Sequence, residues 1–410
     1  PRARRMPTYD SVVLGEKTPI VFDFGSACIK CGFAGEASPR FILPSPFGES
    51  DLKTENLREL FKELIHRLCY RYLIVNPKDR RVVVIESIMT PSKFKDTLGE
   101  ILFMHFEVPS LVFAPAHVVS LFTLGISTAL VLDCGYTEAL VLPVYEGFTI
   151  LGAWQSGPLG GKRIHRDLEI QLRQSAYLVD DSSREQEGIP FGNEHIQLSE
   201  SRLEDIKVRA CFVSPAERAA LWNNWRLLTK EGTEQHDNIP LPDYAEESFA
   251  YPLGDEGGQY LRIPSRLRET ASEGLFTGDT DNVTLHTLIL ESLLLCPIDC
   301  RRQLIENIVC IGGTCMMPGF IHRLNEEIKT ALELPRYASL AALKDSIKFH
   351  NPPSKANYTA WLGGSIFGAL ESLPGRSYSR TKYLEQKTIP DWSSIWETDI
   401  TENRDFIHTR

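Results

Sequence analysis

The chain has 410 residues, of which 42% are hydrophobic, and carries a formal net charge of −10 at pH 7. This length is sufficient for two or more domains with packed cores. The acidic balance argues against a general nucleic-acid binder or a ligand of anionic membranes, and no apolar run approaches the length that spans a bilayer.

The first 150 residues alternate between short apolar runs and amphipathic periods. Residues 1–5, a basic cluster before Met6, are interpreted as a leader rather than a targeting signal. The apolar runs predict strands at 19–24, 29–33, 40–43, 81–86, 111–114, 129–133 and 139–144. The amphipathic periods predict helices at 52–72, 92–106 and 117–124. Ser92 is a candidate N-cap, and Gly125 ends the third helix. This alternation indicates an α/β chain.

The rest of the chain contains one long stretch without clear periodicity. Helices are expected at 160–178, 198–213 and 283–295, and a buried strand at 307–311 precedes a helix that begins near Pro318. Residues 214–282 are rich in Gly, Pro, Asp, Glu, Ser and Thr. We interpret them as a partly ordered, variable insertion that packs against a partner.

Cysteine usage predicts thiols rather than disulfides. Nine cysteines without a recognisable secretory signal indicate a cytoplasmic protein. Cys28-x-x-Cys31 has the spacing of redox and zinc sites, but no second such pair accompanies it, so we favour a structural role. Cys296 and Cys300 are separated by Pro297, which indicates a helix end rather than a ligand pair.

Two of the predicted strands end in the turn signal Asp-x-Gly. The first is Asp23-Phe24-Gly25-Ser26, and the second is Asp133-Cys134-Gly135. Two such turns facing each other can bind the phosphates of a nucleotide through backbone N–H groups and a metal ion through Asp23 and Asp133. Alternatively, each aspartate only caps its own turn. The second turn continues into Tyr136-Thr137 where small residues are needed, which predicts a nucleotide clamp that has largely lost catalysis.

Two further glycine motifs and one lysine are candidates for the same site. Gly312-Gly313-Thr314 follows a buried strand and allows close backbone approach to a flat ligand, although such a motif alone is usually just a turn. Lys30 follows the first turn, where an ammonium could reach a phosphate, and its alternative role is that of a surface lysine. Gly363-Gly364 lies in an apolar segment, and we expect its main role to be tight packing of a helix against the core, with a functional role secondary.

These segments together resemble the actin family. The motifs at 23–45, 143–147, 307–319 and 361–366 follow the family's order, and the resemblance spans about residues 16–386. It implies an actin-like fold in which two related α/β domains surround a nucleotide cleft. Within the family, the segments 30–36, 73–87, 132–136, 296–299 and 389–392 are most similar to the actin-related subunits at the pointed end of the dynactin filament.

The resemblance also assigns residues to a degenerate nucleotide cleft. Its cofactor-binding residues would be Asp23, Gly25, Ser26, Lys30, Asp133, Gly135, Lys207, Gly312, Gly313, Thr314 and Met317. Asp23 and Asp133 would contact a metal only together with a bound nucleotide. No cofactor is required, although residual ATP or ADP with Mg could remain bound.

Departures from the family pattern argue against an enzyme. Ala116 stands where the family has its water-orienting glutamine, Leu140 where it has a nearby histidine, and Tyr136 where it has a metal-orienting aspartate. Ala27 replaces a glycine of the first turn, and Val208 replaces the ribose-facing glutamate. Without these groups, nothing evident positions a water for attack, so efficient hydrolysis should fail. We expect no catalytic residues and weak nucleotide binding at most.

A deletion points to the function. The chain between Pro44-Ser45 and Glu86 is far shorter than in actin, so most of the small subdomain at the pointed end is missing. Such a subunit can dock onto a filament's pointed end but offers no normal seat to the next subunit. We therefore expect a non-catalytic cap of the dynactin filament in the cytoplasm and cytoskeleton. Its partners would be the actin-related and actin subunits of that filament and the other pointed-end subunits, with no nucleic acid and no direct membrane insertion.

The resemblance also gives domain boundaries. Residues 1–15 would be a flexible leader, and residues 387–410 a C-terminal extension. The small outer domain would comprise 16–124 and 347–386, and the core of the large inner domain 125–159 and 283–346. Residues 160–282 would form an inserted subdomain with the variable loop 214–282.

Two other functions stay open at this point. One is a slow ATPase or nucleotide switch built on Asp23, Lys30, Asp133 and Gly312-Gly313-Thr314. The other is a nuclear actin-related subunit of a chromatin remodeller, although no basic localisation cluster lies inside the globular region.

Overall fold

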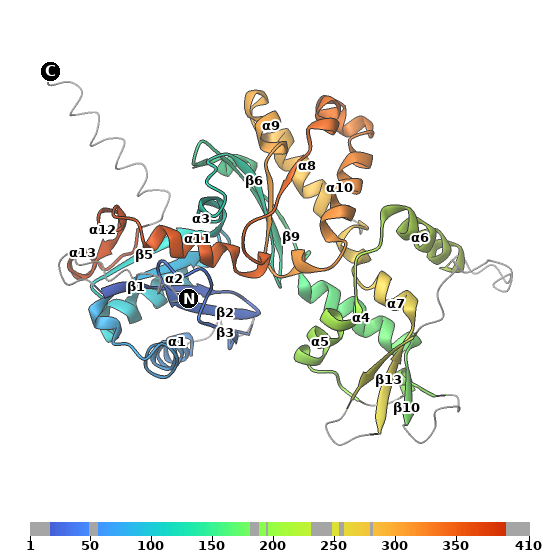
Figure 1. Ribbon diagram of the computed structural model, residues 1–410, viewed down its shortest axis with the longest axis horizontal. Helices are drawn as coiled ribbons and strands as arrows, with labels where there is room; N and C mark the ends of the chain where they lie inside the picture. Colours follow the sequence, from blue (N-terminus) through green and yellow to red (C-terminus); the bar gives the residue numbers. More distant parts are fainter. Residues whose placement is uncertain are drawn as a thin grey trace, which may run out of the picture. The chain divides into compact units, whose positions relative to one another are not determined.

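The computed structural model describes residues 17–48, 56–180, 188–193, 196–230, 248–253, 258–278 and 282–390 (Figure 1). Internal contacts divide the chain into two compact units. Unit 1 combines the chain up to Thr123 with the chain from Ala360 on, and unit 2 runs from Leu124 to Thr359. The predicted leader and residues 391–410 of the predicted extension, including Trp392, lie outside the described residues.

Unit 1 is built on a six-stranded sheet with the order β16-β5-β4-β1-β2-β3. Its strands are β1 (Lys17–Phe24), β2 (Cys28–Phe33), β3 (Phe41–Pro44), β4 (Arg80–Glu86), β5 (Ser110–Pro115) and β16 (Tyr378–Ser379). β1 is parallel to β4 and antiparallel to β2. Residues of α1 (Leu57–His66) and α2 (Ser92–Glu100) share a hydrophobic cluster with one face of β1 and β2. α3 (Ala116–Phe122) and α11 (Thr359–Gly368) complete the described core of this unit.

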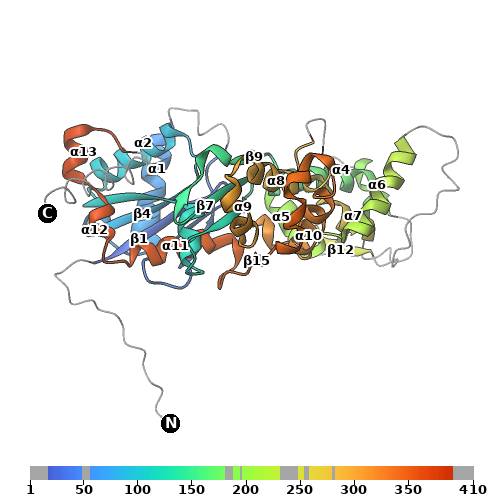
Figure 2. The same ribbon diagram turned by 90° about the horizontal axis from the view of Figure 1, so that it is seen from above.

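Unit 2 repeats this pattern in its first sheet. The order is β15-β14-β6-β7-β8, with β9 paired to β7, and β6 is parallel to β14 and antiparallel to β7. The strands are β6 (Ala129–Cys134), β7 (Ala139–Tyr145), β8 (Phe148–Thr149), β9 (Gln155–Gly157), β14 (Ile308–Ile311) and β15 (Phe349–His350). Each central strand, β1 or β6, ends in an Asp-x-Gly turn, so the two turns occupy equivalent places in related sheets. Figure 2 shows both sheets from above.

The return of the chain to unit 1 comes later than the sequence predicts. The predicted boundary is residue 347, but β15 pairs with β14, so residues up to Thr359 belong to unit 2. A two-residue strand is too short to show a period-2 pattern, which explains why the sequence did not reveal it.

Unit 2 also contains a small antiparallel sheet with the order β11-β10-β13-β12. Its strands are β10 (Tyr177–Asp180), β11 (Ile189–Pro190), β12 (Phe249–Pro252) and β13 (Gln259–Ile263). The helices α4 (Gly161–Ser175), α5 (Glu200–Ala210) and α7 (Ser265–Thr270) lie beside this sheet, and α6 (Ala216–Lys230) follows α5 (Figure 1).

Three sequence predictions need correction here. The predicted helix 160–178 ends at Ser175, and β10 begins at Tyr177. Much of the stretch 214–282, interpreted as loop-like, is regular structure anchored by buried residues such as Trp222 and Leu261. The short strands β12 and β13 find their partners far along the chain, which local periodicity cannot reveal, whereas α6 is a helix of 15 residues that was not predicted from the sequence. Ser92 does not cap α2, because Pro91 holds the N-cap position without a side-chain hydrogen bond.

The other predicted helices form with changed ends. The first two continue as π-helical turns, η2 (Arg67–Tyr72) after α1 and η4 (Ile101–His105) after α2. The remaining helices are α8 (Leu285–Leu295), α9 (Ile298–Ile305), α10 (Phe320–Ala331), α12 (Leu373–Arg376) and α13 (Arg380–Gln386).

Candidate functional site

The first Asp-x-Gly turn lies in unit 1, between β1 and β2. Asp23 and Lys30 are cross-strand partners, and Lys30 Nζ lies 2.7 Å from Asp23 Oδ2. Both side chains are largely buried. A Cβ at Gly25 would lie 2.8 Å from the Cys28 carbonyl oxygen, so this turn requires glycine. Lys30, which was predicted to face a phosphate, is thus paired with Asp23, the predicted metal ligand. Ser26 beside them is exposed.

The CxxC residues of this turn have a structural role. All nine cysteines are free thiols. Cys31 lies in the core of unit 1, and burial raises the pKa of its thiol to about 12. A thiol held protonated is a poor nucleophile and a poor metal ligand, which favours a structural role for Cys31.

The second turn lies in unit 2 and faces the start of α4. The Gly161 N–H donates to the Gly135 carbonyl at 3.1 Å, and the Lys162 N–H donates to the Tyr136 carbonyl at 2.7 Å. A Cβ at Gly160 would lie 2.4 Å from the Tyr136 carbonyl oxygen, so glycine is needed for this approach. The first amides of a helix are the groups that bind anions. Here they bind the carbonyl groups of the turn itself.

The Tyr136 side chain extends this contact across the helix start. A Cβ at Gly161 would lie 3.1 Å from Tyr136 Cδ2 and 3.4 Å from Lys207 Nζ, so the tyrosine ring and the lysine meet there. The Tyr136 hydroxyl donates to Glu200 Oε2 at 2.6 Å. The residue that departs from the family pattern is therefore a structural part of unit 2.

Four polar side chains continue the network from Tyr136. His165, which is buried, has Nδ1 2.7 Å from Glu200 Oε2 and Nε2 2.9 Å from Glu204 Oε2. Lys207 Nζ donates to Glu204 Oε2 at 2.5 Å. Glu200, Glu204 and Lys207 are spaced along one face of α5, a signal that was present in the sequence, but nothing there identified Tyr136 and His165 as their partners.

The network lowers the pKa of both carboxyl groups. Burial alone would raise the pKa of Glu204, but hydrogen bonds from His165 and the charge and hydrogen bond of Lys207 outweigh it and bring the pKa to about 2. Burial likewise opposes the hydrogen bonds from Tyr136 and His165 at Glu200, and the net effect lowers its pKa. The network therefore places two carboxylates beside the second turn.

These pKa shifts predict a pH dependence of stability. Because the pKa of Glu204 falls from 4.5 to about 2 on folding, its contribution is complete above pH 4.5 and is lost as the pH falls toward 2. We expect Glu204→Gln to be less stable than the wild type at pH 7 and to lose less stability on acidification. Urea unfolding between pH 7 and pH 2 measures this, with Glu217→Gln on the exposed surface of α6 as the control. Parallel pH profiles for the wild type and Glu204→Gln would contradict the prediction.

The third glycine motif lies against the second turn. The Thr314 hydroxyl donates to the Gly135 carbonyl at 2.7 Å. Gly312 has φ +95°, and a Cβ there would lie 2.3 Å from the Cys134 carbonyl oxygen and 2.7 Å from Asp133 Oδ1. Unit 2 thus brings together Asp133, Gly135, Gly312 and Thr314, with Gly313 next to them.

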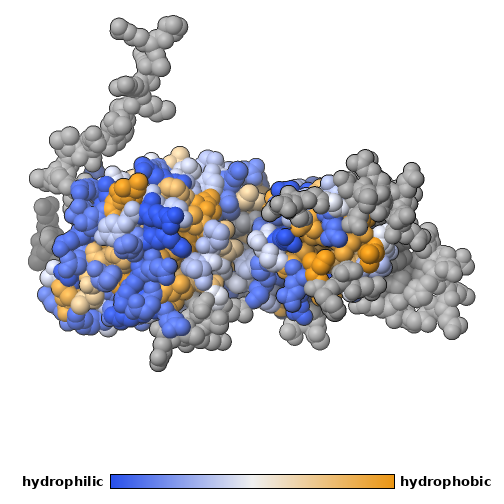
Figure 3. Space-filling model, turned by 90° about the horizontal axis from the view of Figure 1, so that it is seen from below, coloured by the Kyte–Doolittle hydropathy of each residue, from blue (hydrophilic) through white to orange (hydrophobic). Residues whose placement is uncertain are grey.

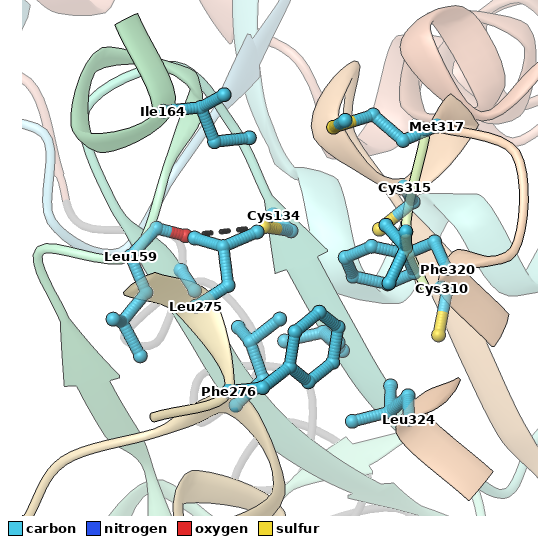
Figure 4. Packing of buried hydrophobic residues seen from close by; sticks show 14 of the residues in the cluster. Cys134, Leu159, Ile164, Leu275, Phe276, Cys310, Cys315, Met317, Phe320 and Leu324 are labelled. Carbon is cyan, nitrogen blue, oxygen red and sulfur yellow. Dashed lines mark hydrogen bonds between the residues drawn. The ribbon is translucent and has the colours of Figure 1, made fainter. Parts of the chain in front are cut away.

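Met317, one of the predicted cofactor-binding residues, is part of the core. It is 8% exposed and belongs to the main hydrophobic cluster of unit 2. Figure 4 shows it in the same cluster as Cys315 and Phe320. The Cys134 thiol of the second turn also lies in this cluster and donates to the Leu159 carbonyl at 3.2 Å (Figure 4).

Ala116 and Leu140, which stand where the family has catalytic groups, have structural roles. Ala116 is the first residue of α3 and Leu140 lies on β7, and both are buried. Val208 is 68% exposed on α5.

In the described part of the chain, no three His, Cys, Asp or Glu side chains are grouped so that they could hold a metal ion. None of the described helices combines the length and apolar character that a membrane crossing requires.

Comparison with known proteins places these turns in a family context. The family model described as Actin matches residues 56–389. The first turn and β1–β3 precede the matched range, whereas the second turn, α5 and Gly312-Gly313-Thr314 lie inside it.

Full-length relatives match most of the chain at low identity. Actin-related protein 10 of Dictyostelium discoideum is 26% identical over 446 residues of alignment, and the match covers 93% of this chain and 90% of that protein. Centractin of Schizosaccharomyces pombe is 26% identical over 416 residues, with 91% and 97% coverage. Putative actin-29 of Dictyostelium discoideum is 25% identical over 404 residues, with 89% and 94% coverage.

Proposed function

This chain belongs to the actin family, and on that basis we propose that it is a non-catalytic structural subunit that caps the pointed end of the dynactin filament. In this role it supports the other pointed-end subunits and, through them, dynein-driven transport along microtubules. The observation that most supports this proposal is in the second turn, where the first two amides of α4 donate hydrogen bonds to carbonyl groups of the turn. These amides cannot bind a phosphate without breaking those hydrogen bonds.

The loss of catalysis follows from residue chemistry. Ala116 and Leu140 carry no group that can orient or activate a water, and both are buried in the fold. The Tyr136 hydroxyl is engaged by Glu200. Together with the hydrogen bonds between the turn and α4, these features disfavour a polyphosphate at the second turn by geometry.

The capping role depends on the connection between β3 and β4. Its described parts are residues 45–48 and 56–79, and the second of these forms α1, the π-helical turn η2 and the short 3₁₀ turn η3 (Pro77–Asp79). We propose that the small subdomain that seats the next subunit of an actin filament is largely missing here. One end of the molecule then docks while the opposite end stops growth, because a heterologous contact cannot propagate without both faces. Similarity to proteins named actin-related protein 10 and centractin supports this assignment.

Binding to the filament tests the proposal directly. We expect the purified protein to co-sediment with purified dynactin filament that lacks its pointed-end subunits, and to appear at one end in electron micrographs. Addition of actin should produce no growth beyond it. Absence of binding, or subunits added beyond the bound protein, would refute the capping function.

Nucleotide content is a second expected result. We expect denatured protein to release far less than one nucleotide per chain, measured by chromatography. The reason is that the first two amides of α4 already donate to carbonyl groups of the second turn. Near-stoichiometric ATP or ADP would show that the turns still bind nucleotide, and the protein would then be a nucleotide-stabilised cap.

One observation favours a second candidate, a slow nucleotide switch. The first turn keeps Gly25 and the Asp23–Lys30 pair, which are the parts that phosphate and metal binding require. ATP turnover by the wild type above that of Asp133→Ala would favour the switch. Equal turnover in both proteins would favour the non-catalytic cap.

A further inference from the structure

The small sheet of unit 2 has one covered face and one exposed face. Leu178, Tyr251, Leu261 and Ile263 are buried in the cluster that also contains residues of α4, α5 and α7. Successive residues of a strand point to opposite faces. The strand registers therefore place one row of residues on the other side, here named the outer face: Tyr177, Val179, Pro190, Ala250, Pro252, Tyr260 and Arg262.

The outer face is apolar for a surface. Tyr177 is 44% exposed, Val179 and Tyr260 are half-buried, and the remaining four residues are exposed. Figure 3 shows hydrophobic residues gathered on the surface of unit 2 in the view from below. Sheets with two apolar faces are normally covered by a second layer on each side, and exposed apolar patches mark interaction sites.

The edges of this sheet are protected against strand addition. Pro190 lies on the edge strand β11 and Pro252 on the edge strand β12. Proline lacks the N–H that an added strand would need, and edge prolines are a common means of preventing edge pairing. A partner is therefore expected to lie across the face, as helices do on sheets.

A single cation lies within this apolar row. Arg262 is exposed on the central strand β13, opposite Tyr177 and Ala250 on its two neighbours. Within the described ranges, its guanidinium forms no hydrogen bond or ion pair. A partner that covers the outer face would desolvate this charge, which is costly unless a carboxylate meets it. Arginine binds carboxylates through two parallel hydrogen bonds, which also sets the partner's position.

We propose that the outer face is a docking surface for an amphipathic helix of another protein, with an aspartate or glutamate in its apolar stripe that pairs with Arg262. The tyrosines supply large apolar area with polar tips, a composition enriched at protein interfaces. The proposal does not depend on filament capping, because it is argued from the outer face alone.

Photo-crosslinking in cells tests the proposal with the full chain. The photoreactive amino acid p-benzoyl-L-phenylalanine replaces Tyr177, and mass spectrometry identifies the linked peptide. We expect one recurrent segment of another protein, helical in pattern and with a carboxylate among its apolar residues. A synthetic peptide of that segment then serves as the probe in fluorescence anisotropy. Arg262→Glu should weaken its binding by about tenfold or more, and exchanging the peptide's carboxylate for arginine should restore binding to Arg262→Glu.

The matched control is Arg166→Glu, which reverses an exposed arginine on α4 away from the outer face and should leave binding unchanged. Tyr260→Ser provides a second variant that weakens binding without changing charge. Unchanged far-UV circular dichroism of each variant excludes misfolding. Cross-links only within this chain or to a second copy of it, no cross-link, or no rescue by the charge exchange would overturn the proposal.

Discussion

Replacing Arg323 with methionine is expected to lower the free energy of unfolding of unit 2 by about 3–5 kcal/mol. Arg323 lies on α10 and is 2% exposed. Its guanidinium donates to both carboxylate oxygens of Glu273, at 2.9 and 3.0 Å, and to Glu327 Oε1 at 2.6 Å. It also donates to the Ser214 carbonyl, and its Cζ lies 4.8 Å from the centre of the Phe276 ring. The variant leaves Glu273 as a buried charge without its main partner.

The size of this loss separates a buried ion pair from an exposed one. Urea unfolding, combined with hydrogen exchange of α10 amides, measures the change in unit 2. Arg302→Met is the control, since Arg302 pairs with Glu306 on the surface and its loss should cost about 1 kcal/mol or less. The double variant Arg323→Met with Glu273→Gln should lose less than Arg323→Met alone. A loss of less than about 1 kcal/mol for Arg323→Met would contradict the prediction.

The network around Arg323 connects segments that the sequence could not place. It joins α10 to Ser214 and Glu273, both within the stretch interpreted as a variable insertion. Composition around Glu273 resembles a loop, because the short elements there gain their burial from partners distant in sequence. The central strands and their Asp-x-Gly turns were predictable for the opposite reason, since each is an apolar run with its turn signal beside it.

The second turn shows the same limit at the site itself. The sequence identified Tyr136 as a departure from the family, and it predicted a loss of function from that departure. It did not reveal that the tyrosine hydroxyl meets Glu200, 64 residues away, or that His165 connects Glu200 to Glu204. Tyr136 is therefore part of a hydrogen-bonded network that stabilises the turn in its present form.

The two turns differ in whether the groups that would face a ligand remain in the family pattern. In unit 1, Gly25 and the Asp23–Lys30 pair remain as the family pattern requires. In unit 2, the amides and side chains that would face a ligand contact each other. Unit 1 also contains a close backbone approach, where α11 meets α3.

Replacing Gly363 with alanine is expected to destabilise unit 1 by about 3 kcal/mol or more. A Cβ at this position would lie 2.0 Å from the Val119 carbonyl oxygen and 2.4 Å from its carbon, so α11 would have to move away from α3. Backbone atoms cannot rotate aside as a flexible side chain can. The same helix holds β1 through a hydrogen bond from Trp361 Nε1 to the Val21 carbonyl at 3.1 Å, so the shift would also reach the strand that carries Asp23.

Gly375→Ala is the matched control, because Gly375 lies in α12 of the same unit and a Cβ there meets no atom within 4 Å. Alanine favours helix over glycine by about 1 kcal/mol, so this variant should be neutral or slightly stabilised. The two substitutions are chemically identical, and their opposite effects isolate the close approach of α11 to α3 from helix propensity. Urea unfolding with hydrogen exchange of α3 amides measures both. Equal stabilities of the two variants would mean that α11 can shift at little cost, and the tight packing predicted from Gly363-Gly364 would then not be what holds unit 1 together.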